Sequence, residues 1–190
     1  AKNLTLQDCK FTAGAGIADS KWYYGQHFGG NLSIINCRIE GFQGVLLADF
    51  SSTSSFTMEQ ALVRVRIKRN YFKNNLGCIA ARGKMDEPMK LCQYSNNKFV
   101  TDSVHSSFWD QIEASNAVLK VVVTDNEAVY PVGNDTVALQ KRGFCQIWSK
   151  NARQFVVEYS GNTISNLRFG VKIAGINGFF SPDSLHEEFK

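Results

Sequence analysis

Acidic, basic and aromatic residues recur at one distance from a repeated bend in this chain. Asp49, Arg82 and Trp109 each lie 12 residues beyond an equivalent bend residue. If the repeat is regular in space, a carboxylate, a guanidinium group and an indole ring lie next to one another in successive repeats. An aromatic ring packs against the C–H face of a sugar, and charged groups bind hydroxyls or carboxylates in forked geometry. This combination is typical of glycan recognition.

Further polar residues lie near Trp109 or in the next repeat. Two carboxylates can cleave a glycosidic bond, one acting as an acid and the other as a base or nucleophile. The candidate catalytic residues are therefore Asp49, Asp110 and Glu113. The candidate substrate-binding residues are Arg82, Trp109, Gln111, Lys141 and Arg142. The alternative is that these side chains are solvated or form salt bridges with neighbouring repeats, and a slip of one residue would turn Asp49 or Trp109 inward.

Six segments share one pattern, and they must position these side chains. Each segment reads apolar, variable, apolar, variable, then a pair of turn residues, one variable residue and one apolar residue. The period of two predicts a strand with one buried face, and the turn pair predicts a bend after it. The segments span residues 4–11, 32–39, 65–72, 92–99, 121–128 and 157–164.

The second residue of each turn pair forms a column through the repeats. Asparagine tolerates the left-handed backbone of a sharp corner, and its amide can both donate and accept hydrogen bonds. We therefore expect the asparagines to form the corners and to stack as a hydrogen-bonded ladder. The column consists of Cys9, Cys37, Asn70, Asn97, Asn126 and Asn162, at intervals of 27 to 36 residues.

A repeat built from strand, corner and strand predicts a parallel β-helix of about six coils, in which each coil contacts its neighbours. We expect the second strands at 44–48, 77–81, 107–109, 136–139 and 170–173. Insertions of variable length are expected after them, at 50–60, 83–90 and 141–152. A β-sandwich is the alternative, but its hairpins would need turns such as Asn-Gly, which occurs once, at Asn177–Gly178.

Composition agrees with a single domain over residues 1–190, which the repeat predicts to be all-β. With 44% hydrophobic residues and 3 prolines, the chain is long enough for one core. It has no run of about 18 apolar residues, so we expect no membrane insertion. Because Ala1 and Lys2 lead directly into the first repeat, we expect the chain to be a piece of a longer protein.

The net charge of +4 has a concentrated basic part on one predicted strand. Arg64, Arg66 and Lys68 alternate with apolar residues and should lie on the outer face. They form either a solvated face that is protected against edge pairing or a patch for an acidic polymer. We expect no nucleic-acid partner, because no recognised binding module or base-stacking motif accompanies the patch.

The five cysteines indicate neither a metal site nor a cofactor. No Cys or His spacing typical of zinc appears, so no metal and no cofactor are expected. Cys9 and Cys37 share a column and could lie within disulfide reach. The favoured interpretation is that they are small buried hydrophobic residues.

The strand followed by Asn-x-Phe, in Asn70–Phe72 and Asn97–Phe99, resembles the right-handed parallel β-helix of the pectate-lyase-like superfamily. That superfamily includes bacteriophage tailspikes and polysaccharide lyases and hydrolases. The resemblance implies a polysaccharide partner, bound along one face of the coil. In many tailspikes, carboxylates line a surface groove between the subunits of a homotrimer. The absence of a signal segment and the unpaired thiols favour a phage-type tail protein, on the virion tail or extracellular.

The leading hypothesis is therefore a polysaccharide-binding β-helix of tailspike type that also depolymerises its ligand if its carboxylates are catalytic. As an enzyme it would be a glycoside hydrolase or a polysaccharide lyase. Two alternatives remain open. One is a structural shaft or spacer without catalytic activity, and the other is a calcium-dependent polysaccharide lyase or epimerase.

Overall fold

The protein is all-β in a computed structural model that describes residues 3–13, 23–28, 30–42, 45–49, 62–75, 79–83, 88–101, 112–116, 118–130, 143–149, 156–166 and 169–175. These residues contain no helix. Their strands form three sheets of six strands each, and every pairing is parallel. Parallel pairing throughout the described strands rules out the β-sandwich alternative.

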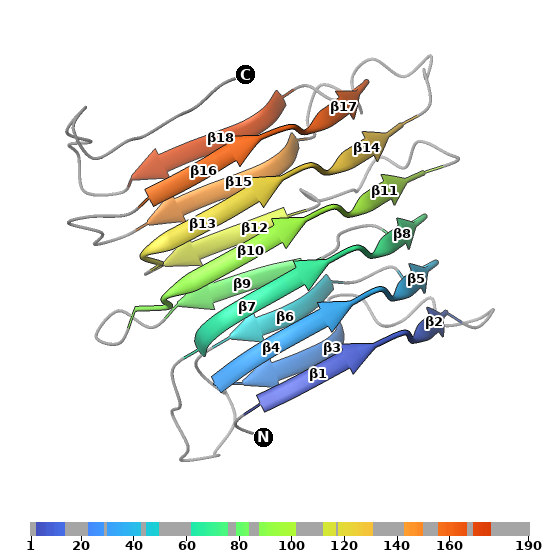
Figure 1. Cartoon of the computed structure of the whole chain (residues 1–190), viewed down its shortest axis with the longest axis horizontal. Coiled ribbons are helices and arrows are strands. Elements are labelled where there is room, and N and C mark those ends of the chain that lie inside the picture. Colours follow the sequence, from blue (N-terminus) through green and yellow to red (C-terminus); the bar gives the residue numbers. More distant parts are fainter. Residues whose placement is uncertain are drawn as a thin grey trace.

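Three sets of strands make up the sheets (Figure 1). Sheet A contains β1 (Asn3–Gln7), β4 (Gly30–Ile35), β7 (Leu62–Lys68), β10 (Leu91–Ser95), β13 (Lys120–Thr124) and β16 (Val156–Ser160). Sheet B contains β2 (Lys10–Thr12), β5 (Arg38–Glu40), β8 (Tyr71–Lys73), β11 (Lys98–Val100), β14 (Glu127–Val129) and β17 (Thr163–Ser165). Sheet C contains β3 (Tyr23–Phe28), β6 (Val45–Asp49), β9 (Ile79–Gly83), β12 (Ile112–Asn116), β15 (Gly143–Ser149) and β18 (Phe169–Gly175).

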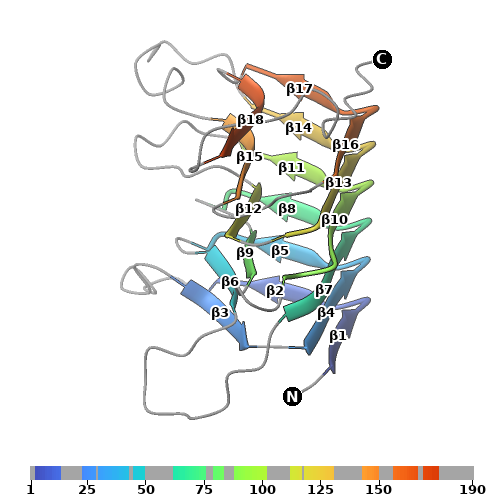
Figure 2. The same ribbon diagram turned by 90° about the vertical axis from the view of Figure 1, so that its left-hand side faces the viewer.

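The chain visits the three sheets in turn, and each round adds one strand to the same side of every sheet. Figure 2 shows the sheets on three sides of a common interior. The prediction of parallel strands that repeat from coil to coil is confirmed, and the arrangement is compatible with a parallel β-helix.

A corner of two residues joins each strand of sheet A to the next strand of sheet B. Its first residue has a left-handed backbone, with φ between 54° and 64° in all six corners. The prediction put this conformation on the asparagine, but the structure puts it one residue earlier. The side chain of the second corner residue can therefore point toward the equivalent residues of the neighbouring repeats. The first residues are Asp8, Asn36, Arg69, Asn96, Asp125 and Gly161.

The predicted asparagine ladder is present at the second corner residue. Nδ2 of Asn70 donates to Oδ1 of Asn97 (3.0 Å), and Nδ2 of Asn97 donates to Oδ1 of Asn126 (2.9 Å). Asn126 donates in the same way to Asn162 (2.9 Å). At the end of the ladder, the backbone N–H of Cys37 donates to Oδ1 of Asn70 (2.8 Å). The ladder satisfies buried polar groups along the line where sheets A and B meet.

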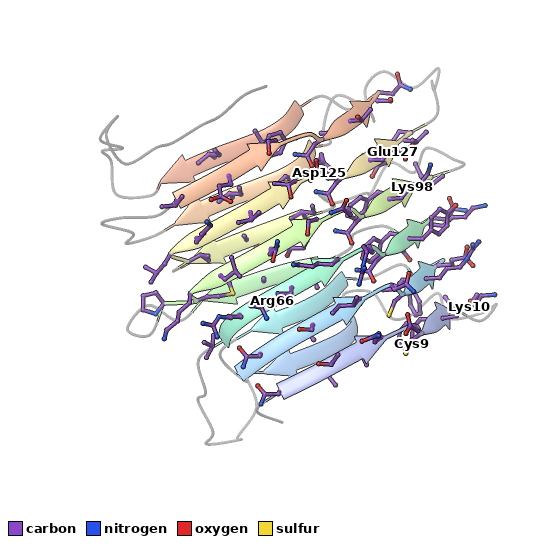
Figure 3. All side chains as sticks on the ribbon, viewed as in Figure 1. Cys9, Lys10, Arg66, Lys98, Asp125 and Glu127 are labelled. Carbon is purple, nitrogen blue, oxygen red and sulfur yellow. The ribbon has the colours of Figure 1, made fainter. Side chains whose placement is uncertain are left out.

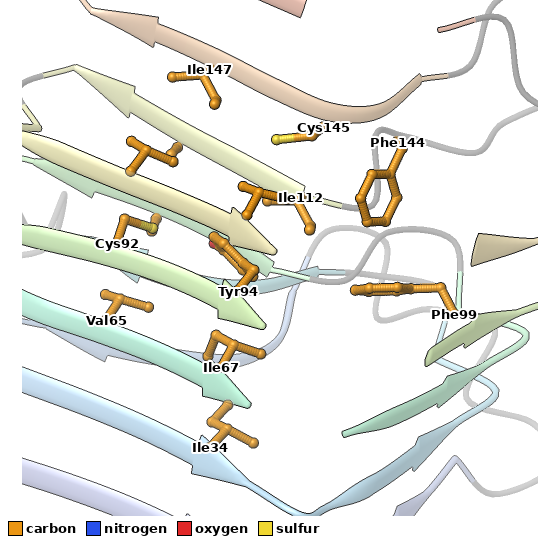
Figure 4. Packing of buried hydrophobic residues seen from close by; sticks show 14 of the residues in the cluster. Ile34, Val65, Ile67, Cys92, Tyr94, Phe99, Ile112, Phe144, Cys145 and Ile147 are labelled. Atoms are coloured by element: carbon orange, nitrogen blue, oxygen red, sulfur yellow. The ribbon is translucent and has the colours of Figure 1, made fainter. Parts of the chain in front are cut away.

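The interior is filled by like residues on successive strands, as the period of two predicts. In sheet A, Val65 pairs with Cys92 and Ile67 pairs with Tyr94. From sheet B, Phe99 stacks on Phe72, with ring centroids 4.8 Å apart. Side chains of all three sheets meet in one buried cluster (Figure 4), which includes Ile34, Ile67, Tyr94, Phe99, Ile112, Phe144 and Ile147.

Two of the predicted second strands do not coincide with the strands of sheet C. The strand of sheet C is β12 in the fourth round of strands and β15 in the fifth, and the predicted segments 107–109 and 136–139 lie outside the described residues. β15 lies inside the predicted insertion 141–152. The error arises because the connection from sheet B to sheet C also varies in length, whereas the prediction placed all variation after sheet C. The predictions at 44–48, 77–81 and 170–173 overlap β6, β9 and β18.

Candidate functional site

A row of four residues crosses sheet C on neighbouring strands. The offset between β6 and β9 puts Asp49 at the level of Arg82. Arg82 pairs with Ser115 of β12, and Ser115 pairs with Trp148 of β15. We call these four residues the sheet C row. Neighbouring parallel strands lie about 4.8 Å apart, so the row places its members at that spacing.

Alternation along the strands puts the register positions of the sheet C row on the outer side of the sheet. In β12, Ile112 and Ala114 are fully buried, whereas Glu113 between them is half-buried. Successive residues of a strand point to opposite faces. The register position of Ser115, two residues beyond Glu113, is therefore on the outer side.

Glu113 belongs to a second outer row beside the first. Its partners on the adjacent strands are Ala80 and Gln146. From the opposite side of the interior, the hydroxyl of Tyr94 donates to the backbone carbonyl of Glu113 (3.4 Å). Burial raises the pKa of Tyr94 well above its ordinary value, so the hydroxyl keeps its proton. This contact ties the backbone of sheet C at the row to sheet A.

The structure brings together only part of the predicted site. Asp49 and Arg82 lie level with each other, as their equal spacing predicts, and Glu113 lies on the next strand but one from Asp49. The expected stacking of Trp109 on Arg82 is wrong, because the partner of Arg82 is Ser115. Ser115 lies 18 residues beyond Asn97, whereas the prediction assumed 12. The remaining predicted residues, Trp109, Asp110, Gln111, Lys141 and Arg142, lie outside the described residues.

Sequence reasoning missed Trp148, the aromatic member of the row. A signal for it exists, because Asp49, Arg82, Ser115 and Trp148 follow one another at a constant interval of 33 residues. Counting from the bend hid this interval, since the connections between bend and strand differ in length. Trp148 thus adds an aromatic residue to the row one strand beyond the position that was expected for Trp109.

Some of the described cations on the outer faces of sheets A and B form ion pairs. Lys98 pairs with Glu127 (2.9 Å) and Lys120 pairs with Glu158 (2.5 Å). Arg38 donates to Glu40 (2.6 Å) and lies over the ring of Tyr71. The hydrogen bond from the Arg38 guanidinium lowers the pKa of Glu40. Figure 3 shows Lys98 and Glu127 on adjacent strands of sheet B.

The described residues offer no site for a metal ion. No group of three or more His, Cys, Asp or Glu side chains within the described ranges could hold one. Cys9, Cys37, Cys92 and Cys145 are free thiols; Cys37 is buried, as the favoured interpretation expects, whereas Cys9 is only half-buried. In the part of the chain that the structure describes, no helix has the length and apolar character that crossing a membrane requires.

Comparisons with protein-family models, curated proteins and solved structures found no match to this chain.

Proposed function

We propose that the protein is a right-handed parallel β-helix of the pectate-lyase-like kind and that it binds a polysaccharide on the outer face of sheet C. The observation that carries the proposal is the sheet C row, which sets Asp49, Arg82 and Trp148 on one face of parallel neighbouring strands. An indole ring can pack against a sugar ring, and the two charged residues can bind its hydroxyl or carboxylate groups.

Regular strand spacing suits a long ligand better than a small one. A polymer that runs across the strands meets a new side chain about every 4.8 Å, so successive sugars contact equivalent positions on successive coils. The stacked core and the asparagine ladder hold these positions in a fixed order. Such a preorganised surface reduces the entropy that is lost on binding.

Cleavage of the polysaccharide is a separate part of the proposal. Asp49 and Glu113 are two strands and two residues apart, which corresponds to about 12 Å between their Cα atoms. Inverting glycosidases hold their carboxyl groups about 6.5–9.5 Å apart and retaining enzymes about 5–5.5 Å. Asp49 and Glu113 would therefore have to lean toward each other, or Asp110 would have to complete the pair.

The resemblance to tailspikes adds a virion-tail or extracellular location and a homotrimer to the proposal. Light scattering on the purified chain measures its molar mass and so tests the trimer directly. A monomer at micromolar concentration would contradict the homotrimer.

A glycan array that includes capsular polysaccharides and lipopolysaccharides tests the function. We expect selective retention of at least one polysaccharide. Release of oligosaccharides that stops in Asp49→Asn, Asp110→Asn or Glu113→Gln would establish cleavage, and unsaturated products lost on chelation would identify a calcium-dependent lyase. A chain that retains no polysaccharide would contradict the proposal and favour a structural shaft.

A further inference from the structure

The outer face of sheet A carries three cations in a line along β7. Arg64, Arg66 and Lys68 alternate with Val65 and Ile67, which are fully buried, so the three cations lie on the outer side. Arg64 and Arg66 are exposed and Lys68 is half-exposed. Residues two apart on a strand are separated by about 6.6 Å. We call these three residues the β7 strip.

The strands on both sides of the β7 strip present only uncharged residues to it. Arg66 is flanked by Ser33 of β4 and Gln93 of β10. The other flanking residues are equally uncharged: Asn31, Ile35, Leu91 and Ser95. No ion pair joins the strip to an acidic side chain in the described part of the chain, unlike Lys98, Lys120 and Arg38.

Protection of a sheet edge does not explain the β7 strip. Cations that prevent edge pairing belong on edge strands, whose backbone groups are unpaired. β7 is the third of six strands in sheet A, and its backbone bonds to β4 on one side and to β10 on the other. Three neighbouring like charges repel one another, and an anionic partner on this face would offset the repulsion.

The chemistry of the face favours a polysaccharide as this partner. Guanidinium groups bind carboxylate and sulfate groups in two-pronged geometry. Ser33, Asn31 and Gln93 can hydrogen-bond sugar hydroxyls beside them. Binding of single-stranded nucleic acid relies on aromatic side chains that stack on bases. The described outer positions of sheet A contain no aromatic residue.

We infer that the face of sheet A around the β7 strip binds an anionic polysaccharide, one that carries carboxylate or sulfate groups. Figure 3 shows Arg66 on this face, with strands of sheet A on both sides. The surface lies on a different sheet from the sheet C row. The inference extends polysaccharide binding to the acidic class, but it requires nothing of the sheet C row.

Binding of the purified chain to heparin and to polygalacturonate tests the inference, with dextran as the neutral polymer and oligo(dT) as the nucleic acid. The strip variant is Arg64→Gln/Arg66→Gln/Lys68→Gln. The matched control is Lys10→Gln/Lys73→Gln/Lys98→Gln on sheet B, because both variants lower the net charge from +4 to +1. Thermal unfolding followed by circular dichroism establishes that each variant is folded.

We expect the wild type to bind at least one of the two acidic polysaccharides and not dextran, with an affinity that falls as salt rises. The strip variant should lose at least about tenfold in affinity, which corresponds to one charge-assisted contact, and the control should lose less than about threefold. Trp148→Ala should leave this affinity unchanged, even if it abolishes binding at the sheet C row.

Four results would overturn the inference. The first is no binding of either acidic polysaccharide. The second is an equal loss in the strip variant and the control, which would indicate attraction by net charge alone. The third is binding of oligo(dT) as tight as that of the polysaccharides. The fourth is loss of polyanion binding in Trp148→Ala, which would move the binding to sheet C.

Discussion

The side-chain amide of Asn97 donates from Nδ2 to Oδ1 of Asn126, 2.9 Å away on the next coil. Both residues are about 1% exposed, so this bond joins two coils inside the protein. Oδ1 of Asn97 in turn accepts from the backbone N–H and from Nδ2 of Asn70, each at 3.0 Å. Each repeat is thereby tied to the next one along the line where sheets A and B meet.

Replacement of Asn97 by alanine should destabilise the protein by about 3 to 5 kcal/mol. The carbonyl of Ile67 and the backbone N–H of Asn70 would lose their partner in the interior, and Nδ2 of Asn70 would keep only its bond to the carbonyl of Ile34. Each lost bond to a buried group costs about 1–3 kcal/mol. Urea unfolding measures the change. Asn162→Ala is the control at the half-buried end of the ladder, where water can replace the lost bonds, and its loss should be smaller. Equal losses at both positions would show that burial of the ladder contributes nothing.

Phe99→Ala should cost about 3–5 kcal/mol, because the ring is fully buried between two others. Phe99 stacks on Phe72 and meets the edge of Phe144 at 5.3 Å between centroids. Val129→Ala, on the exposed side of the same sheet, should cost less than about 1 kcal/mol. The midpoint of thermal unfolding, compared between each variant and the wild type, measures both effects. A small effect of Phe99→Ala would contradict the joining of sheets B and C through one core.

Gly161→Ala should destabilise the corner before β17 by about 1 kcal/mol. Gly161 has a φ of +64°, which L residues with a Cβ rarely adopt. A Cβ there would also approach Oδ1 of Asp125 and force that side chain to move. The reverse change, Asn96→Gly, should be neutral or stabilise slightly, because Asn96 has a φ of 57° in the equivalent corner. Chemical unfolding measures the change in the free energy of unfolding for both variants. A loss in Gly161→Ala without a loss in Asn96→Gly would support the corner geometry, and a stabilising Gly161→Ala would refute it.

Alkaline solution should weaken the fold from about pH 9 upward. Burial raises the pKa of Cys92 from 9.0 to about 12. The unfolded chain thus releases this proton near pH 9, while the folded chain keeps it. Between these values the free energy of unfolding should fall by about 1.4 kcal/mol per pH unit. Tyr94, whose pKa is raised by burial, should add to the loss above pH 10.

Cys92→Val tests this assignment, because valine occupies the equivalent positions 65, 121 and 157. Urea unfolding at pH 8, 9 and 10 should show a flatter decline in the variant than in the wild type. A decline of equal slope in both proteins would mean that the Cys92 thiol does not cause it.

Much of the fold follows from the sequence because each coil repeats one local pattern. The alternation around Leu32 and Val65 and the ladder of Asn70, Asn97 and Asn126 depend on residue type alone, and the structure confirms them. The left-handed residue was predicted one position too late. Residue type did not reveal it, because glycine, arginine and aspartate also adopt the left-handed backbone in the corners of this chain.

The candidate site was less predictable, because it depends on the lengths of connections. To predict the row, one must know how many residues separate each strand of sheet C from its bend. The irregular segments between them have no sequence period that reveals this number. The interval of 33 residues between successive members of the row, from Asp49 to Trp148, becomes meaningful only once the pairing of β12 with β15 is known.

The affinity of the chain for the polysaccharide retained on a glycan array, compared between the wild type and Trp148→Ala, tests the central claim most directly. Tyr71→Ala removes an aromatic residue from sheet B and serves as the control. We predict that Trp148→Ala lowers the affinity at least about tenfold, the worth of one well-packed ring on a sugar, while Tyr71→Ala changes it less than about twofold. An affinity unchanged in Trp148→Ala would contradict polysaccharide binding on the outer face of sheet C.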